Sequence, residues 1–473
     1  MLFNSIDFAI FLPAVFILYW FATNHNLKLQ NLLLLVVSYI FYGWWDWRFL
    51  SLIAFSTSID FMVGLQLQKQ VIPSRRKALL MLSILVNLGF LGFFKYYNFF
   101  LENFTNAFSF FGSDIQASSL QIILPVGISF YTFQTLSYAI DVYRKKLKPT
   151  KDFIAFASFV SFFPQLVAGP IERATKLLPQ FYTQRKFKYS DAISGLKQIL
   201  WGLLKKVVIA DNCAVFVNII FDNTQDYSGS TLLLGAVLFA FQIYGDFSGY
   251  SDIAIGTAKL FGFQLMQNFA FPYFSRDIAE FWRRWHISLS TWFRDYLYIP
   301  LGGSRGGTWM KVRNTFVIFI VSGFWHGANW TFIIWGLLNA IYFLPLLLRN
   351  KNRNHIEIVA SQGELPSLKA LFNIGKTFAL TTIAWVFFRA ENVAHAWAYL
   401  KGIFSKSLFS FPEIRPSNLL LLILLFLIIE WLGRREKFAL EKVGLTWPKP
   451  LRIALYYSMV LVLFWFSRNE QTF

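Results

Sequence analysis

The sequence predicts an all-α protein that crosses a lipid bilayer many times, and three observations carry this prediction. Of its 473 residues, 56% are hydrophobic and only 15% are charged, whereas an ordinary soluble domain carries about 25% charged residues. The apolar residues form continuous runs of about 17 to 25 residues, the length with which a helix crosses a bilayer. These runs do not alternate apolar with polar residues, so a membrane β-barrel is not expected.

The spans follow one another in this order: 7–21, 31–45, 49–67, 78–97, 122–143, 191–221, 232–254, 314–348, 372–388, 419–429 with its flanks, and 453–466. Together they predict about 11 or 12 crossings. The apolar stretch 153–169 has basic residues on both sides, so we expect a re-entrant hairpin that turns near Pro164. We predict one membrane domain over residues 1–473, with its core at 153–348 and C-terminal helices at 371–467.

Basic clusters between the spans predict the orientation. The formal net charge is +19, which we assign to cytoplasmic loops and not to nucleic-acid binding, since no nucleic-acid recognition module is visible. The clusters at 69–77 and 144–151 both fall inside if the N-terminus is extracytoplasmic, so we expect a multi-pass membrane protein with that orientation. The first apolar run has no basic leader or cleavage site and is interpreted as a membrane helix. A single cysteine, Cys213, excludes an intramolecular disulfide.

The strongest candidate for chemistry is His326, in the run SGFWHGANW. A histidine within lipid-length apolar sequence is costly and marks function. Because 314–348 is flanked by basic residues on both sides, two arms, the N-terminal one short, should meet at 322–329 and place His326 at the apex. Trp325 and Asn329 are expected to line a substrate pocket there. The alternative is a histidine that only hydrogen-bonds to a neighbouring helix.

A second candidate, His286, lies in FWRRWHISLS. Ser275 is expected to cap a helix on which Trp282, His286 and Ser290 share one face, since they recur every fourth residue. Trp282 is therefore a predicted substrate contact. The alternative is an amphipathic helix at the membrane surface that binds no ligand.

Basic residues near His286 are candidates for binding phosphate, because guanidinium groups pair with phosphate oxygens. They are Arg283, Arg284, Arg294 and, in the following glycine-rich loop, Arg305. That loop contains GGSRG, which matches the G-x-S-x-G nucleophile pattern, but no strand-to-helix elbow is expected there. No Walker-type loop, HExxH or Cys/His metal spacing is present, so no bound cofactor and no metal are predicted.

Four longer runs resemble the signature of the membrane-bound O-acyltransferase (MBOAT) family. They are FWRRWHISLSTWFRDYLYIPLGG, SGFWHGANWTFIIWG, YGDFSGYSDIAIG and FPQLVAGPI. The sequence is most similar to the bacterial branch of alginate O-acetyltransferases and teichoic acid D-alanyl transfer proteins. The resemblance implies a ring of helices around a thinned centre with a tunnel, in which His326 and His286 are the family's two histidines.

The resemblance also implies the reaction. An acyl group, expected to be acetyl, moves from a cytoplasmic thioester such as acetyl-CoA to a hydroxyl of an extracytoplasmic glycan or an acetyltransferase partner protein. His326 is expected to act as general base, and His286 to orient the thioester or stabilise its charge. Three alternatives stay open: a carrier-protein donor within the same family, a proton-coupled transporter that uses His326 and Asp246, and a non-catalytic anchor of an export complex.

Overall fold

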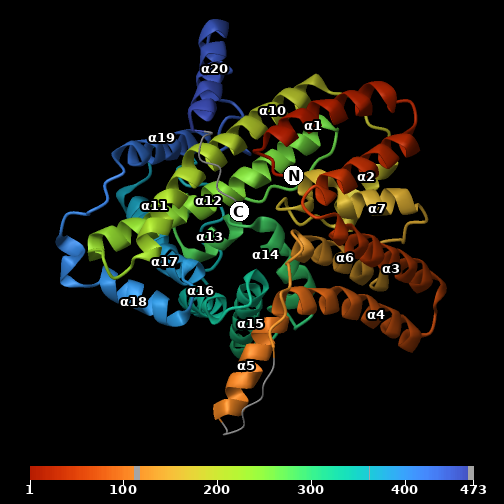
Figure 1. The fold of residues 1–473 in the computed structure, drawn as a ribbon, viewed down its shortest axis with the longest axis horizontal. Helices are drawn as coiled ribbons and strands as arrows, with labels where there is room; N and C mark the ends of the chain where they lie inside the picture. The colour runs from red at the N-terminus through yellow and green to blue at the C-terminus, as the bar shows by residue number, and fades with distance from the viewer. Residues whose placement is uncertain (111–117, 362, 467–473) are drawn as a thin grey trace. The chain divides into compact units, whose positions relative to one another are not determined.

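The computed structural model describes residues 1–110, 118–361 and 363–466, and every regular element in these ranges is a helix (Figure 1). Within them, six helices are long and apolar enough to cross a membrane: Trp47–Lys69, Pro73–Phe110, Gly229–Leu260, Trp330–Leu348, Leu368–Arg389 and Lys449–Phe466. Shorter apolar helices lie at Ile6–Ala22, Leu27–Gly43, Phe153–Leu166 and Ser417–Gly433. The predicted all-α, multi-pass class is confirmed. The exact number of crossings, the tunnel and the orientation stay predictions.

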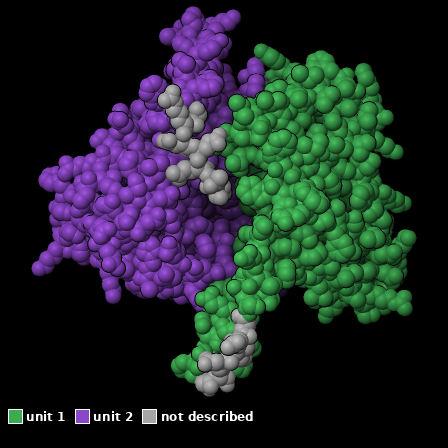
Figure 2. Space-filling view, in the orientation of Figure 1, with its two compact units in different colours: residues 1–192, 258–265 green, residues 193–257, 266–473 purple. Residues whose placement is uncertain are grey.

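The chain divides into two compact units (Figure 2), residues 1–192 with 258–265, and residues 193–257 with 266–473. Unit 1 contains α1 (Ile6–Ile17), α2 (Leu27–Gly43), α3 (Leu50–Lys69), α4 (Pro73–Leu91), α5 (Tyr97–Phe110), α6 (Ile128–Tyr143), α7 (Phe153–Ser161), α8 (Phe163–Leu166) and α9 (Ala174–Leu177). Two helices run across the unit boundary, α10 (Tyr189–Leu203) and α12 (Gly229–Leu260).

Unit 2 contains both candidate histidines. Its remaining helices are α11 (Asp211–Asp222), α13 (Ile278–Arg284), α14 (Ile287–Phe293), α15 (Thr308–His326), α16 (Trp330–Leu348), α17 (Leu368–Arg389), α18 (Val393–Ile403), α19 (Ser417–Gly433) and α20 (Lys449–Phe466). A large buried aromatic cluster forms its core, with Trp285, Trp335 and Trp385 among its members. Helix α18 was not predicted, because its eleven residues are too few to register as an apolar span.

Two predicted elements of unit 1 differ from the structure. The span predicted at 122–143 is helical only from Ile128, because Gly127 adopts a left-handed conformation with φ 75° just before it. The stretch 153–169 is broken at Phe162, and Pro164 lies in the first turn of α8, where its missing N–H is tolerated. The Phe159 carbonyl oxygen next to this break accepts hydrogen bonds from Gln134 and Gln165 side chains, at 2.6 and 3.1 Å.

The predicted span 191–221 is interrupted by a π-helical segment, Leu204–Ala210, between α10 and α11. Two buried lysines of this segment pair with carboxylates of unit 2. Lys205 pairs with Asp252, and Lys206 lies 2.7 Å from both Asp211 and Asp246. Asp246, which a proton-coupled transporter would need as a proton carrier, is therefore held in an ion pair.

Candidate active site

Helices α15 and α16 form a hairpin that ends at His326. Both helices have 19 residues, so the expectation of a short N-terminal arm was wrong; α15 begins at Thr308, before the apolar part of the sequence. A Cβ atom at Gly323 would collide with the Phe332 carbonyl oxygen, and one at Gly336 with the Phe319 carbonyl oxygen. The two helices therefore touch through their backbones, which fixes the position of the turn.

The predicted turn at 322–329 is confirmed, and it places His326 in the last turn of α15. The His326 side chain is half-buried. Its ring is enclosed by Trp325, Trp335 and Phe388, with ring centroids 4.9, 5.2 and 5.2 Å away in edge-on orientation. Asn329 uses both ends of its amide within the protein: Oδ1 caps α16 by accepting from Thr331 N, and Nδ2 donates to the Glu391 carbonyl oxygen at 2.7 Å.

His286 lies at a break between two helices, and this corrects the predicted continuous helix. Asp277, not Ser275, caps α13, and α13 ends at Arg284. His286 has φ 45° and ψ 54°, a left-handed conformation that non-glycine residues rarely adopt, and α14 begins after it. The side chains of Trp282, His286 and Ser290 therefore do not follow one helical face.

The structure nevertheless brings the two histidines together. Their ring centroids are 6.5 Å apart, and the Trp325 ring lies 6.1 Å from the His286 ring. His286 is only 1% exposed. Burial, and after it the neighbouring His326 ring, lower the pKa of His286 well below its ordinary value. This shift favours the neutral form of the His286 imidazole.

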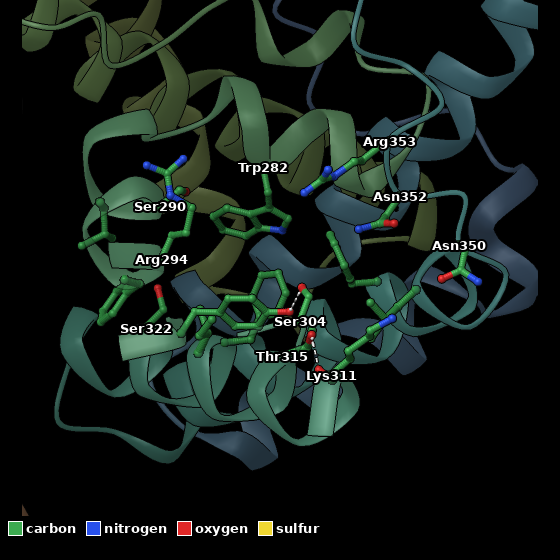
Figure 3. Close-up of a pocket in the computed structure, with 17 residues that line it drawn as sticks. Trp282, Ser290, Arg294, Ser304, Lys311, Thr315, Ser322, Asn350, Asn352 and Arg353 are labelled. Carbon is green, nitrogen blue, oxygen red and sulfur yellow. Dashed lines mark hydrogen bonds between the residues drawn. The ribbon is translucent and has the colours of Figure 1, made fainter. Parts of the chain in front are cut away.

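A cavity of about 540 Å³ is lined by residues of α13, α14, α15 and α16 (Figure 3). The predicted residues Trp282 and Arg294 line it, together with Lys311 and Arg353. Neither histidine lines it, but Ser322, one helical turn before His326, does. Trp282 also connects the cavity to the histidine pocket, because its ring contacts Trp335, which contacts the ring of His326.

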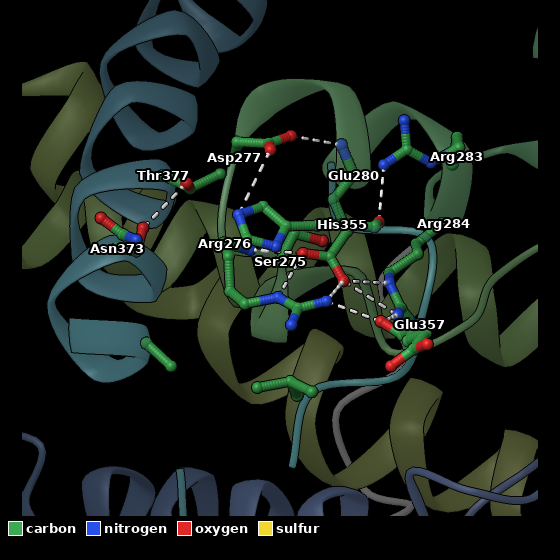
Figure 4. Close-up of polar contacts among 12 residues, drawn as sticks. Ser275, Arg276, Asp277, Glu280, Arg283, Arg284, His355, Glu357, Asn373 and Thr377 are labelled. Atoms are coloured by element: carbon green, nitrogen blue, oxygen red, sulfur yellow. Dashed lines mark hydrogen bonds and ion pairs between the residues drawn. The ribbon is translucent and has the colours of Figure 1, made fainter. Parts of the chain in front are cut away.

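The other predicted arginines do not line this cavity. Figure 4 shows the polar contacts around two of them, Arg283 and Arg284. Arg283 donates to the carbonyl oxygens of Asn352 and His355, each at 2.7 Å. Arg284 pairs with the buried carboxylate of Glu280 at 2.9 Å. Arg305 is exposed in the loop after α14. These contacts give Arg283 and Arg284 a structural role in tying the segment after α16 to α13.

Sequence patterns did not identify Asn268, Lys311 or Arg353 as site residues. From the sequence, Lys311 and Arg353 were interpreted only as basic residues of cytoplasmic loops. Their separation in the sequence does not predict that both line one cavity. Asn268 lies in a segment without regular structure before α13, and its Oδ1 lies 3.1 Å from Nδ1 of His286. No pattern in the sequence singles out this asparagine.

Comparisons with known proteins identify the family to which the chain is related. The model of the MBOAT, membrane-bound O-acyltransferase family, matches residues 145–380. The chain is 40% identical to the probable alginate O-acetylase AlgI of Pseudomonas aeruginosa, over 92% of this chain and 82% of the relative. It is 37% identical to the peptidoglycan O-acetyltransferase of Helicobacter pylori, over 85% and 80% of the two chains. It is 30% identical to the teichoic acid D-alanyltransferase of Bacillus subtilis, over 46% and 57%.

Proposed function

The chain belongs to the membrane-bound O-acyltransferase family, and from this premise we propose that it moves an acetyl group from a cytoplasmic thioester to a hydroxyl outside the membrane. The acceptor is a polysaccharide, or a partner protein that passes the group on. Support for acetyl comes from the two relatives with the greater coverage, which are named as an O-acetylase and an O-acetyltransferase. We also propose that residues 1–473 act as one membrane domain, with the basic loops on the cytoplasmic side.

His326 is the general base of this proposal. The observation that carries it is a half-buried imidazole at the end of α15, enclosed by aromatic rings and 6.5 Å from a second imidazole. A neutral imidazole can take the proton of a hydroxyl at physiological pH. The hydroxyl oxygen then attacks the thioester carbonyl carbon, the C–S bond breaks, and the leaving thiolate takes the proton back from His326.

The cavity of Figure 3 is the proposed thioester site. Its volume lies within the range of small-molecule pockets, about 300–1,000 Å³. Lys311, Arg294 and Arg353 supply positive charge for the phosphates of coenzyme A or of a carrier's phosphopantetheine. Two lining residues connect the cavity to His326. Ser322 lies one helical turn before His326, and the Trp282 ring contacts Trp335, which contacts the His326 ring.

A carrier-protein donor is the second candidate, because one relative is named as a teichoic acid D-alanyltransferase. The two donors are distinguished by the purified protein. Release of free coenzyme A from acetyl-CoA, in the presence of an acceptor, supports the first candidate. Transfer only from an acyl-loaded carrier protein supports the second.

His326→Ala tests the central assignment. General-base catalysis contributes about 10²–10⁴-fold, so the variant should lose at least about 99% of transfer while inserting and eluting like the wild type. His25→Ala, an exposed histidine in unit 1, is the matched control. Transfer by His326→Ala at the rate of this control would refute the role of His326.

A further inference from the structure

The amide of Asn268 lies in a buried hydrogen-bond cluster beside His286. Its Oδ1 lies 3.2 Å from Ser288 N, 2.9 Å from Ser288 Oγ and 3.1 Å from Nδ1 of His286. Its Nδ2 donates to Ser251 Oγ at 3.1 Å. A backbone N–H can only donate, so the contact with Ser288 N identifies the facing atom of Asn268 as its oxygen and fixes the orientation of the amide.

The tautomer of His286 follows from this orientation. Two acceptors 3.1 Å apart would repel without a proton between them, so Nδ1 of His286 carries the hydrogen and donates it to Asn268. A neutral imidazole has one N–H, which leaves Nε2 as a bare acceptor. Among the described residues, Nε2 has no hydrogen-bond partner, although the side chain is 1% exposed.

A buried acceptor without a partner is unfavourable, so a donor is expected to reach Nε2 when substrate is bound. The rings nearest to His286 belong to Phe247, Trp325, Phe269 and His326, with centroids 4.6, 6.1, 6.4 and 6.5 Å away. The proposed base is therefore among the rings around His286, and a donor that reaches Nε2 would lie close to the reacting hydroxyl.

The chemistry of the two reactants decides which of them binds Nε2. A thioester carbonyl oxygen, and the oxyanion that develops on it, accept hydrogen bonds, and a bare nitrogen cannot donate to them. An acceptor molecule with hydroxyl groups brings O–H donors. We propose that Asn268 holds His286 as the Nδ1–H tautomer, so that Nε2 binds an O–H group of the acyl acceptor. This inference rests on the proposed function, and it assigns His286 to the acceptor and not to the thioester.

The two histidines then have separate tasks. His326 removes the proton of the reacting hydroxyl and returns it to the leaving thiolate. His286 keeps its proton on Nδ1 and accepts a hydrogen bond from a neighbouring hydroxyl of the same acceptor, as adjacent hydroxyls on a sugar ring would provide. Asn268 is a positioning residue, since it acts through His286.

Nitrogen-15 NMR of the full chain in detergent, with ¹⁵N-labelled histidine, tests the tautomer without reference to activity. Protonated and bare ring nitrogens differ in chemical shift, and the chain has only five histidines to assign. We expect Nδ1–H at His286 in the wild type and a mixture of tautomers in Asn268→Leu. An Nε2–H ring in the wild type would overturn the proposal.

Steady-state transfer from acetyl-CoA to de-O-acetylated alginate oligosaccharides or peptidoglycan fragments tests the role. Asn268→Leu should raise the acceptor KM about tenfold, the worth of one hydrogen bond, and leave the donor KM unchanged. Asn24→Leu, in the loop before α2, is the matched control. An unchanged acceptor KM, or an equal rise in the donor KM, contradicts the proposal.

Two further outcomes are distinguishable. If Asn268→Leu does not fold, Ser251→Ala, which removes only the partner of Asn268 Nδ2, serves for both measurements. It should also broaden the tautomer population and raise the acceptor KM. Wild-type protein that transfers no acetyl group refutes the proposed function instead, and the NMR spectrum then still decides the tautomer of His286.

Discussion

The position of His326 depends on the close contact of α15 and α16, and Gly323→Ala tests that dependence. The new Cβ atom would collide with the carbonyl oxygen of Phe332, which belongs to a helix backbone and cannot rotate away as a side chain could. Restoring an ordinary van der Waals distance of about 3.5 Å requires the helices to separate by on the order of 1 Å. This displacement acts one turn before His326.

The expected magnitudes separate an effect on catalysis from an effect on stability. Overpacking of this kind costs about 1–3 kcal/mol, and the better helix propensity of alanine offsets about 0.5–1 kcal/mol of it. The free energy of unfolding should therefore fall by at most about 2.5 kcal/mol. A displacement of about 1 Å in a catalytic group costs about 10²-fold in rate. Activity should thus fall far more than stability.

The assay is release of free thiol from acetyl-CoA in the presence of acceptor, with thermal unfolding of the same detergent-purified samples. Gly375→Ala is the control, because Gly375 also lies within a helix of unit 2 but a Cβ atom there would meet no atom within 4 Å. This control should keep wild-type activity and gain about 0.5–1 kcal/mol of stability from the better helix propensity of alanine. If Gly323→Ala transferred acetyl at half the wild-type rate or more, the backbone contact would not be what positions His326.

Two more predictions concern charge. Arg353→Ala and Lys311→Ala should each raise the donor KM several-fold at low salt and less at high salt. Arg305 lies outside the cavity, so Arg305→Ala should raise the donor KM less. Donor titrations at two ionic strengths measure this difference, and equal effects of the three substitutions would exclude the cavity as the phosphate site. Burial alone would raise the pKa of Glu280. Hydrogen bonds from Arg276, together with the charges of Arg284 and Arg276, hold this pKa below its ordinary value. Its stabilisation is therefore present above the unfolded-state pKa of about 4.3 and is lost as pH falls through the lower folded value. Glu280→Gln should be less stable than the wild type by about 3 kcal/mol at neutral pH and should lose less stability on acidification, which unfolding curves at pH 7 and pH 3 will measure.

Sequence patterns were sufficient for the class of fold, and they singled out two histidines whose rings lie 6.5 Å apart in the structure. The apolar runs predicted helices of membrane length, and basic residues on both sides of 314–348 predicted a hairpin, which the structure contains. They were insufficient at the places where helices stop. The four-residue spacing of Trp282, His286 and Ser290 suggested a shared face, but His286 adopts a left-handed backbone conformation and ends the periodicity.

Charge composition was a poor guide to which basic residues face the cavity. Four arginines near His286 were equivalent in the sequence, yet Arg283 donates to backbone carbonyl oxygens of the segment after α16. Lys311 and Arg353 line the cavity instead. Lys311 lies near the start of α15, and Arg353 lies in the segment after α16. This selection depends on contacts between segments distant in sequence, and neither spacing nor composition records those contacts.

The dipeptide Trp-His occurs at 285–286 and at 325–326, each time where a helix ends. Trp285, next to His286 in the chain, is linked to Trp335 through Trp385, which contacts Trp285 at 5.0 Å and stacks on Trp335 at 5.6 Å. Trp335 in turn contacts the ring of His326 at 5.2 Å. A packed aromatic core is dense and resists displacement, so it holds the two imidazoles at their spacing more firmly than either helix end could.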